Sequence, residues 1–224
     1  MSKSARRNFD SDLELLNVEM IKMSAMVERA IENSVTAFKN QDEKLAKAVI
    51  EGDRDVNEAE KQIEAKCLSL ILRQQPVARD LRSVSTALKM VTDIERIGDH
   101  AADIAEIAQY MKGEHIFEMV EHIPAMAQVA IEMVHNAVRA FVEQDLDLVK
   151  AVTEEDDVMD DLFDKTKSEV VEILKQSKSK EALDLGVDFL MISKYFERIG
   201  DHAVNICEWV EFGITGEYQK QRIL

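Results

Sequence analysis

The seven residues "ERIGDHA" occur twice in this chain, at Glu95–Ala101 and at Glu197–Ala203. A second match supports the repetition: the segments Ala37–Val49 and Ala140–Val152, which read "AFKNQDEKLAKAV" and "AFVEQDLDLVKAV", agree at eight of thirteen positions. The two heptapeptides are 102 residues apart and the two longer segments are 103 apart, so the same order recurs. Self-similarity of this kind indicates a duplicated structural unit. We therefore predict two tandem repeats, which span residues 1–114 and 115–224.

The apolar residues of each half recur with a helical period. Leu13, Leu16, Met20 and Met23 follow one another at intervals of three and four residues, which places them on one face of a helix. Only seven Gly and two Pro are present in 224 residues, so few connecting turns are expected. The sequence predicts an all-α fold, in which six long helices form two tandem antiparallel three-helix bundles. The predicted helices lie near residues 13–38, 45–74, 79–111, 118–143, 146–176 and 181–212, with breaks at Pro76 and Gly113.

The charge of the chain limits its partners. The formal net charge is −16, from 28 basic and 44 acidic residues. Because such a chain repels phosphate backbones and anionic lipids, we expect no nucleic-acid partner and contact with a membrane only through other proteins. Cys67 and Cys207 have neither metal-site spacing nor the density of a disulfide framework, which favours a reducing compartment. With no apolar signal-peptide core and no window long enough to span a bilayer, the sequence predicts a cytoplasmic protein.

Each heptapeptide carries a Glu and an Asp four residues apart. At about 100° per residue, Glu95 and Asp99 lie roughly 40° apart on the helix surface and away from the apolar face. The preceding helix carries a line of polar residues at i, i+4, i+7 and i+11: Asp53, Asn57, Glu60 and Glu64. Like charges at this spacing cost a few tenths of a kcal/mol per pair, which favours a counter-cation held by carboxylates. A solvated charged face remains the alternative interpretation.

The sequence contains no recognisable active site. It has no Gly-rich phosphate loop, no Ser or Cys beside an evident base, and no His-Glu-x-x-His motif. His100 and His202 follow the Asp of each heptapeptide but point about 100° away from it, so they need not share its cation. Arg96 and Arg198 can neutralise the acids within their own helices. We therefore expect that the protein is not an enzyme.

The chain resembles the PhoU family of phosphate-uptake regulators over nearly its whole length. The resemblance rests on the two repeats and on the stretches "QQPVARDLRSVSTALKMVTDIERIGDHAADIAE" in the first and "YFERIGDHAVNICEWVEFGITGE" in the second. It implies two similar three-helix bundles in a cytoplasmic protein that forms a homodimer. It also implies a regulator that restrains phosphate uptake and represses the phosphate-starvation response when phosphate is plentiful. The implied partners are the ATPase subunit of the phosphate ABC transporter and a sensor histidine kinase.

The family's E/D-x-x-x-D motifs are associated with metal ions, so the resemblance implies iron or zinc as cofactors, with manganese or magnesium as alternatives. It assigns a pair of ligands to each of four helices: Asp53 and Asn57, Glu95 and Asp99, Asp156 and Asp160, and Glu197 and Asp201. Asn57 departs from a pure carboxylate pattern, although an amide oxygen also ligates hard cations. The second repeat has "KSKEALDLG" in place of "QQPVARDLR", so the two bundles need not bind metal alike.

Three functional hypotheses follow. The expected one is a metal-binding regulator without catalytic activity, whose acids saturate with metal and show no turnover. The alternative is a metal-dependent hydrolase of a phosphate compound, which requires an open coordination position on the metal. In the third, the acids form only a docking surface for basic partners, and partner binding is indifferent to chelation.

Overall fold

The computed structural model describes residues 3–111, 120–176, 179–218 and 221–222 of the chain. This part contains six long helices and a two-stranded antiparallel pair at its end. The helices are α1 (Lys3–Asn40), α2 (Glu43–Gln74), α3 (Arg79–Ala108), α4 (Ile123–Glu143), α5 (Leu146–Gln176) and α6 (Lys180–Thr215), and the strands are β1 (Glu217–Tyr218) and β2 (Gln221–Arg222). The predicted fold of six long helices is confirmed. The short strand pair is an addition that the sequence pattern did not indicate.

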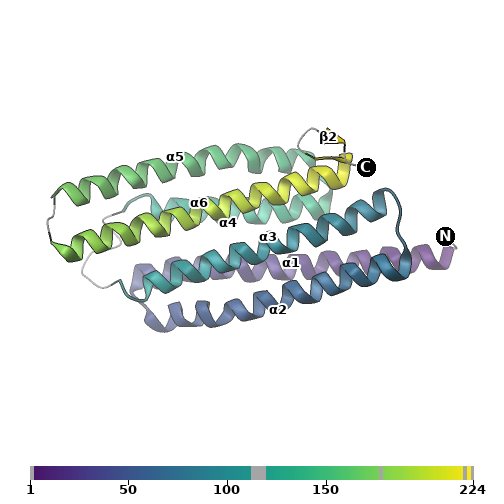
Figure 1. The fold of residues 1–224 in the computed structure, drawn as a ribbon, viewed down its shortest axis with the longest axis horizontal. Coiled ribbons are helices and arrows are strands. Elements are labelled where there is room, and N and C mark those ends of the chain that lie inside the picture. Colours follow the sequence, from purple (N-terminus) through teal and green to yellow (C-terminus); the bar gives the residue numbers. More distant parts are fainter. Residues whose placement is uncertain (1–2, 112–119, 177–178, 219–220, 223–224) are drawn as a thin grey trace.

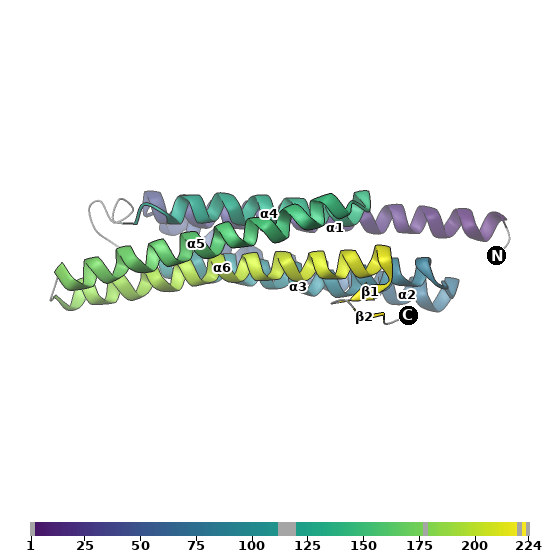
Figure 2. The same cartoon turned by 90° about the horizontal axis from the view of Figure 1, so that it is seen from above.

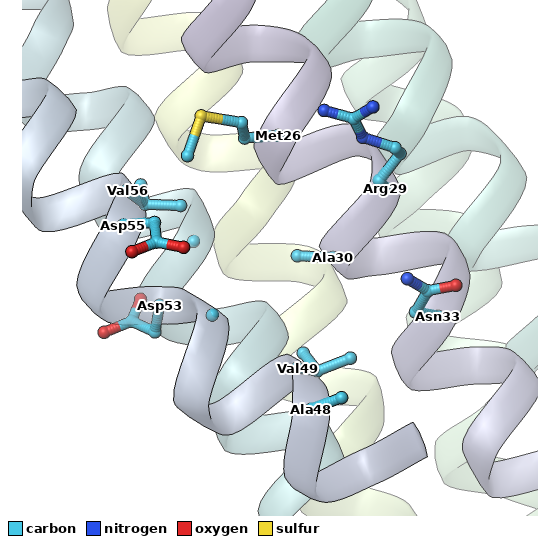
Figure 3. Close-up of a pocket in the computed structure, with 11 residues that line it drawn as sticks. Met26, Arg29, Ala30, Asn33, Ala48, Val49, Asp53, Asp55 and Val56 are labelled. Atoms are coloured by element: carbon cyan, nitrogen blue, oxygen red, sulfur yellow. The ribbon is translucent and has the colours of Figure 1, made fainter.

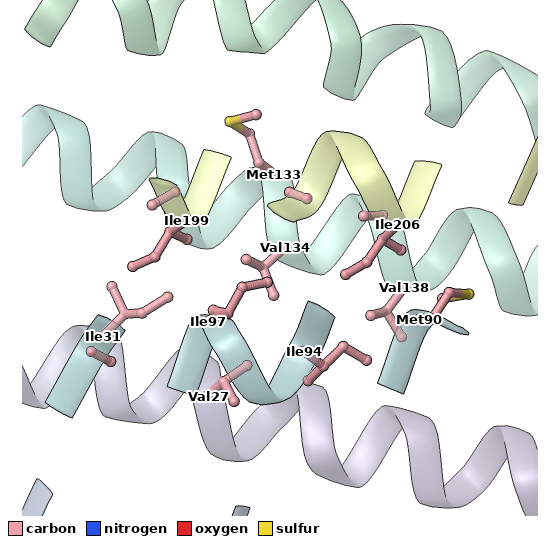
Figure 4. Packing of buried hydrophobic residues seen from close by; sticks show 14 of the residues in the cluster. Val27, Ile31, Met90, Ile94, Ile97, Met133, Val134, Val138, Ile199 and Ile206 are labelled. Atoms are coloured by element: carbon pink, nitrogen blue, oxygen red, sulfur yellow. The ribbon is translucent and has the colours of Figure 1, made fainter. Parts of the chain in front are cut away.

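Each repeat folds into a three-helix bundle, and the two bundles share one core. α1, α2 and α3 contact one another in the first bundle, as α4, α5 and α6 do in the second. The bundles lie side by side in one elongated body, because α3 packs along α6 and α1 along α4 (Figures 1 and 2). Val27 and Ile97 of the first bundle belong to the same buried cluster as Val134 and Ile199 of the second (Figure 4). Among the described residues, no helix combines the length and the apolarity needed to cross a membrane.

The dipeptide "QD" that the two aligned segments share makes the same turn in each repeat. Gln41 and Gln144 adopt left-handed backbone conformations, with φ of 52° and 57°, which end α1 and α4. The carboxylates of Asp42 and Asp145 then accept hydrogen bonds of 2.8 to 3.3 Å from backbone N–H groups in the first turns of α2 and α5. The first N–H groups of a helix have no partner within the helix, so these caps specify where α2 and α5 begin.

The ends of four helices differ from the prediction. α1 begins at Lys3, ten residues before the predicted start. α3 ends at Ala108, three residues early, because the next backbone N–H groups make i→i+3 hydrogen bonds that tighten the chain into a turn. α4 begins at Ile123, and Pro124 occupies its first turn, where the missing N–H costs no hydrogen bond. α6 continues to Gly216, whose φ of 84° ends it. The predicted start of that fourth helix at 118, the break at Gly113 and the boundary after residue 114 lie outside the described residues.

Candidate functional site

The glycine of each heptapeptide lets the acid-bearing helices approach closely. A Cβ atom on Gly98 would lie 3.0 Å from Val56 Cγ1 and 3.6 Å from Asp53 Oδ1. A Cβ atom on Gly200 would lie 3.2 Å from Asp156 Oδ1. Larger residues at these two positions would push α2 away from α3 and α5 away from α6. The glycine of each heptapeptide, Gly98 or Gly200, is therefore the feature of the sequence that marks a close approach of two helices.

The first acidic edge is formed by Asp53 and Asn57 of α2 with Glu95 and Asp99 of α3. Asn57 Nδ2 donates a hydrogen bond of 3.0 Å to Asp53 Oδ2. The other side-chain oxygen of each residue, Asp53 Oδ1 and Asn57 Oδ1, is buried and has no hydrogen-bond partner among the residues that the structure describes. A buried acceptor without a partner costs about 1–3 kcal/mol, so two of them side by side favour a cation or a donor.

The carboxylates of the first edge act on one another. Burial raises the pKa of Asp53, and the charge of Asp99 raises it further, against a smaller lowering by the Asn57 hydrogen bond. Burial also raises the pKa of Glu95, followed by the charges of Asp99 and Glu60. Arg96 relieves part of this repulsion from the solvent side, since its guanidinium lies 2.8 Å from Asp99 Oδ2 and 3.6 Å from Glu95 Oε2.

The second acidic edge is formed by Asp156 and Asp160 of α5 with Glu197 and Asp201 of α6. The pKa of Asp156 is raised from 3.8 to about 6, first by burial and then by the charges of Asp160 and Asp201. Burial and the charge of Glu197 raise the pKa of Asp201 in the same way. All eight residues that the sequence assigned to metal binding therefore lie on these two edges, four on each.

Each edge has a basic side chain of its own, Arg96 on the first and Lys194 on the second, but the neighbours of the two edges differ. Lys194 Nζ lies 2.5 Å from Glu197 Oε2, and the same ammonium lies 5.4 Å from the centre of the Phe163 ring. By the repeat alignment, the corresponding residues of the first repeat are Thr92 and Glu60. The first repeat thus has the carboxylate of Glu60 where the second has the aromatic ring of Phe163, and Thr92 where the second has Lys194.

The donor chemistry of the first edge fits a metal ion. Carboxylate and amide oxygens are hard ligands, and two of these oxygens are buried without a partner. In the part of the chain that the structure describes, no three His, Cys, Asp or Glu side chains already surround a common point. Metal binding there requires side-chain rotation, which is available because Glu95 and Asp99 lie on an accessible surface of α3, with side-chain exposures of 14% and 32%.

The two histidines of the heptapeptides lie between the bundles and not on the acidic edges. His202 Nδ1 lies 2.8 Å from Asp93 Oδ1, which joins α6 to α3. The ring of His100 lies 5.5 Å from the ring of His202 and 5.5 Å from that of Tyr195. Periodicity indicated only that these rings point away from the acids. The partners Asp93 and Tyr195 could not be found from sequence, because they come from the opposite repeat.

Comparison with a family model gives two matches in this chain. The model, described as the PhoU domain, matches residues 20–108 and again residues 123–210. The first match runs from α1 to α3 and the second from α4 to α6, so each three-helix bundle corresponds to one copy of the domain.

Several relatives match over nearly the full length. The phosphate-specific transport system accessory protein PhoU homolog of Clostridium acetobutylicum is 39% identical over 95% of this chain and 96% of its own. Homolog 1 of Thermotoga maritima is 34% identical, over 96% of this chain and 92% of its own. The crystal structure of PhoU from Pseudomonas aeruginosa is 30% identical and has a TM-score of 0.83, over 93% of this chain and 100% of its own. The crystal structure of the phosphate transport system regulatory protein PhoU from Streptococcus pneumoniae has a TM-score of 0.84 at 25% identity, over 93% of this chain and 98% of its own. The chain belongs to the PhoU family.

Proposed function

We propose that this protein is a metal-binding regulator of a phosphate transport system and has no catalytic activity of its own. The names of its relatives, accessory and regulatory proteins of phosphate transport, support the assignment to transport. In this proposal the protein is cytoplasmic and homodimeric, and it reaches the membrane only through its partners. It binds the ATPase subunit of the phosphate ABC transporter and a sensor histidine kinase. When phosphate is plentiful, it restrains uptake and represses the phosphate-starvation response.

The observation that carries the metal-binding part is the orphaned pair of oxygens on the first acidic edge, Asp53 Oδ1 and Asn57 Oδ1. Together with Glu95 and Asp99 they would hold iron or zinc, with manganese or magnesium as alternatives. On the second edge the corresponding ligands are Asp156, Asp160, Glu197 and Asp201. A bound cation would neutralise carboxylates that raise one another's pKa, and it would tie α2 to α3 and α5 to α6.

Elemental analysis of single-edge variants tests this proposal. Wild type is compared with Asp99→Asn on the first edge and Asp201→Asn on the second, after loading with iron, zinc, manganese or magnesium and removal of excess metal. Asp55→Asn and Asp161→Asn are the controls, because both are exposed acids on α2 and α5, the other helix of each edge, and neither is an assigned ligand. Each edge variant should lose the metal of its own edge only, and both controls should retain the full content. Circular dichroism verifies that every variant is folded.

Three results would contradict the proposal. Wild type that retains no metal leaves the acids as a docking surface. Metal that persists in an Asp99→Asn, Asp201→Asn double variant places the ligands elsewhere. Hydrolysis of a phosphate ester by metal-loaded wild type, abolished by Asp99→Asn, makes the protein a metal-dependent hydrolase.

A further inference from the structure

A pocket of about 220 Å³ opens beside the first acidic edge, between α1 and α2 (Figure 3). α1 contributes Arg29 and Asn33, which are exposed residues of that helix (Figure 3). α2 contributes Gly52 and Asp53, so a candidate metal ligand also lines this pocket. A ligand in the pocket would therefore lie next to the cation that the proposed function assigns to the first edge.

Arg29 is the one basic residue among those that line the pocket. Among the described residues it forms no ion pair or hydrogen bond, although 44 acidic residues are present in the chain. Asn33, one helical turn further along α1, likewise has an amide without a partner among these residues. A guanidinium presents five N–H donors in a planar fork that matches the oxygens of phosphate or carboxylate groups, and an amide adds two more. The donors of this pocket therefore favour an oxyanion.

Gly52 keeps the wall of the pocket open. A Cβ atom at this position would have nothing within 4 Å, so the packing of the helices does not require glycine there. A glycine in the interior of a helix destabilises it relative to alanine. Gly52 is one of the residues that line the pocket, and its missing side chain leaves open space there.

The second repeat is different at the same two positions. By the shift of 103 residues, Arg29 corresponds to Glu132 and Gly52 corresponds to Glu155. Burial raises the pKa of Glu155, and Glu132 raises it further both by its charge and by a hydrogen bond between the two side chains. Glu132 also accepts a hydrogen bond of 2.6 Å from Gln128. Where the first repeat has an unpaired cation beside open space, the second has two carboxyl groups in contact, which would repel an anion.

We propose that the pocket between α1 and α2 binds a phosphate oxyanion, with Arg29 and Asn33 as donors and the cation of the first acidic edge as counter-charge. The inference rests on the proposed function, because without a cation the carboxylates of Asp53 and Asp55 would repel the same ligand. The two edges then differ in function: the first binds metal and anion together, and the second binds metal alone. Phosphate concentration thereby acts on one bundle only.

Isothermal titration calorimetry of the metal-loaded full chain with inorganic phosphate tests the inference. Arg29→Gln removes the guanidinium, and Gly52→Glu places the second repeat's carboxylate in the pocket. Both should weaken phosphate binding by about ten-fold or more, because each removes or opposes a charge-assisted contact. The control is Arg139→Gln, which removes an exposed arginine that pairs with Glu143. This control should bind phosphate as wild type does.

Titration with glycerol 3-phosphate distinguishes free phosphate from a phosphate ester as the source of the oxyanion. Whichever of the two binds more tightly is the ligand, and either order supports an oxyanion site. Elemental analysis of the same samples separates the two proposals. Samples that retain metal but show no phosphate binding, or show binding that Arg29→Gln and Gly52→Glu leave unchanged, overturn this inference and leave the proposed function intact. Samples that retain no metal overturn the proposed function first.

Discussion

Asp156→Asn should stabilise the metal-free protein at neutral pH. In the folded chain the pKa of Asp156 is raised from 3.8 to about 6 by burial and by the neighbouring carboxylates. The folded state therefore binds this proton more tightly than the unfolded state does, and stability falls as the pH rises from 3.8 through 6. At pH 7 the folded state carries the full cost of the buried charge. An amide of the same shape does not carry this cost.

The size of the effect follows from the two pKa values. A difference of one in pKa corresponds to about 1.36 kcal/mol, so the full cost of the Asp156 charge would be about 3 kcal/mol. Solvent reaches part of this side chain and screens the charge, which lowers the expected gain to about 1–2 kcal/mol. The gain should be complete at pH 7 and should vanish near pH 4, where the wild-type carboxyl is largely protonated in the folded state.

Urea unfolding of chelator-treated wild type and Asp156→Asn at pH 4, 5, 6, 7 and 8 measures this gain. Asp161→Asn is the matched control, because it removes an exposed charge from the same helix and should change stability by less than about 0.5 kcal/mol. Equal stability of Asp156→Asn and wild type at pH 7 would refute the reasoning. So would a gain that persists undiminished at pH 4, since it could not come from the ionised carboxylate.

Four further predictions concern stability in urea at pH 7. Gly52→Ala should add about 0.5–1 kcal/mol, because its Cβ meets no atom and alanine favours a helix; a loss would mean that the pocket wall cannot accept a methyl group. Asp42→Ala should cost about 1 kcal/mol by removing the α2 cap. Phe189→Ala should cost about 3–5 kcal/mol, because that ring is fully buried. A double-mutant cycle on Glu19 and Lys66, 2.7 Å apart and partly exposed, should give a coupling below about 1 kcal/mol that falls with added salt.

Local features of the fold were readable from the sequence because helix formation depends on spacing along the chain. The recurrence of apolar residues at intervals of three and four indicated the helices. Pro76 and the "QD" turns separate neighbouring helices, because proline cannot continue a helix and the Gln of each turn has a left-handed backbone conformation. The same 100° step placed Glu95 and Asp99 on one face. The seven acids and one amide that were assigned as ligands were therefore placed on helix faces before any contact between helices was known.

Contacts between segments far apart in sequence could not be read in this way. The ion pairs Arg96–Asp99 and Lys194–Glu197 are local, because each joins residues three apart on one helix. By contrast, the contact of Lys194 on α6 with the Phe163 ring on α5 joins two helices, and helix spacing did not indicate it. The pairing of His202 with Asp93 joins residues 109 positions apart. This contact forms only where the two repeats pack against each other, because each repeat supplies one of its two residues.

The sequence by itself determined the duplication, the six helices and the faces on which the acids lie, because each follows from local periodicity. Only the tertiary structure decided how closely α2 approaches α3 and which described oxygens are left without partners. It also decided that Arg29 and Gly52 line a pocket in the first repeat. At the same positions of the second repeat, Glu132 and Glu155 are in contact. Burial and electrostatic coupling arise when helices pack together, so they depend on distances in space that no spacing along the chain specifies.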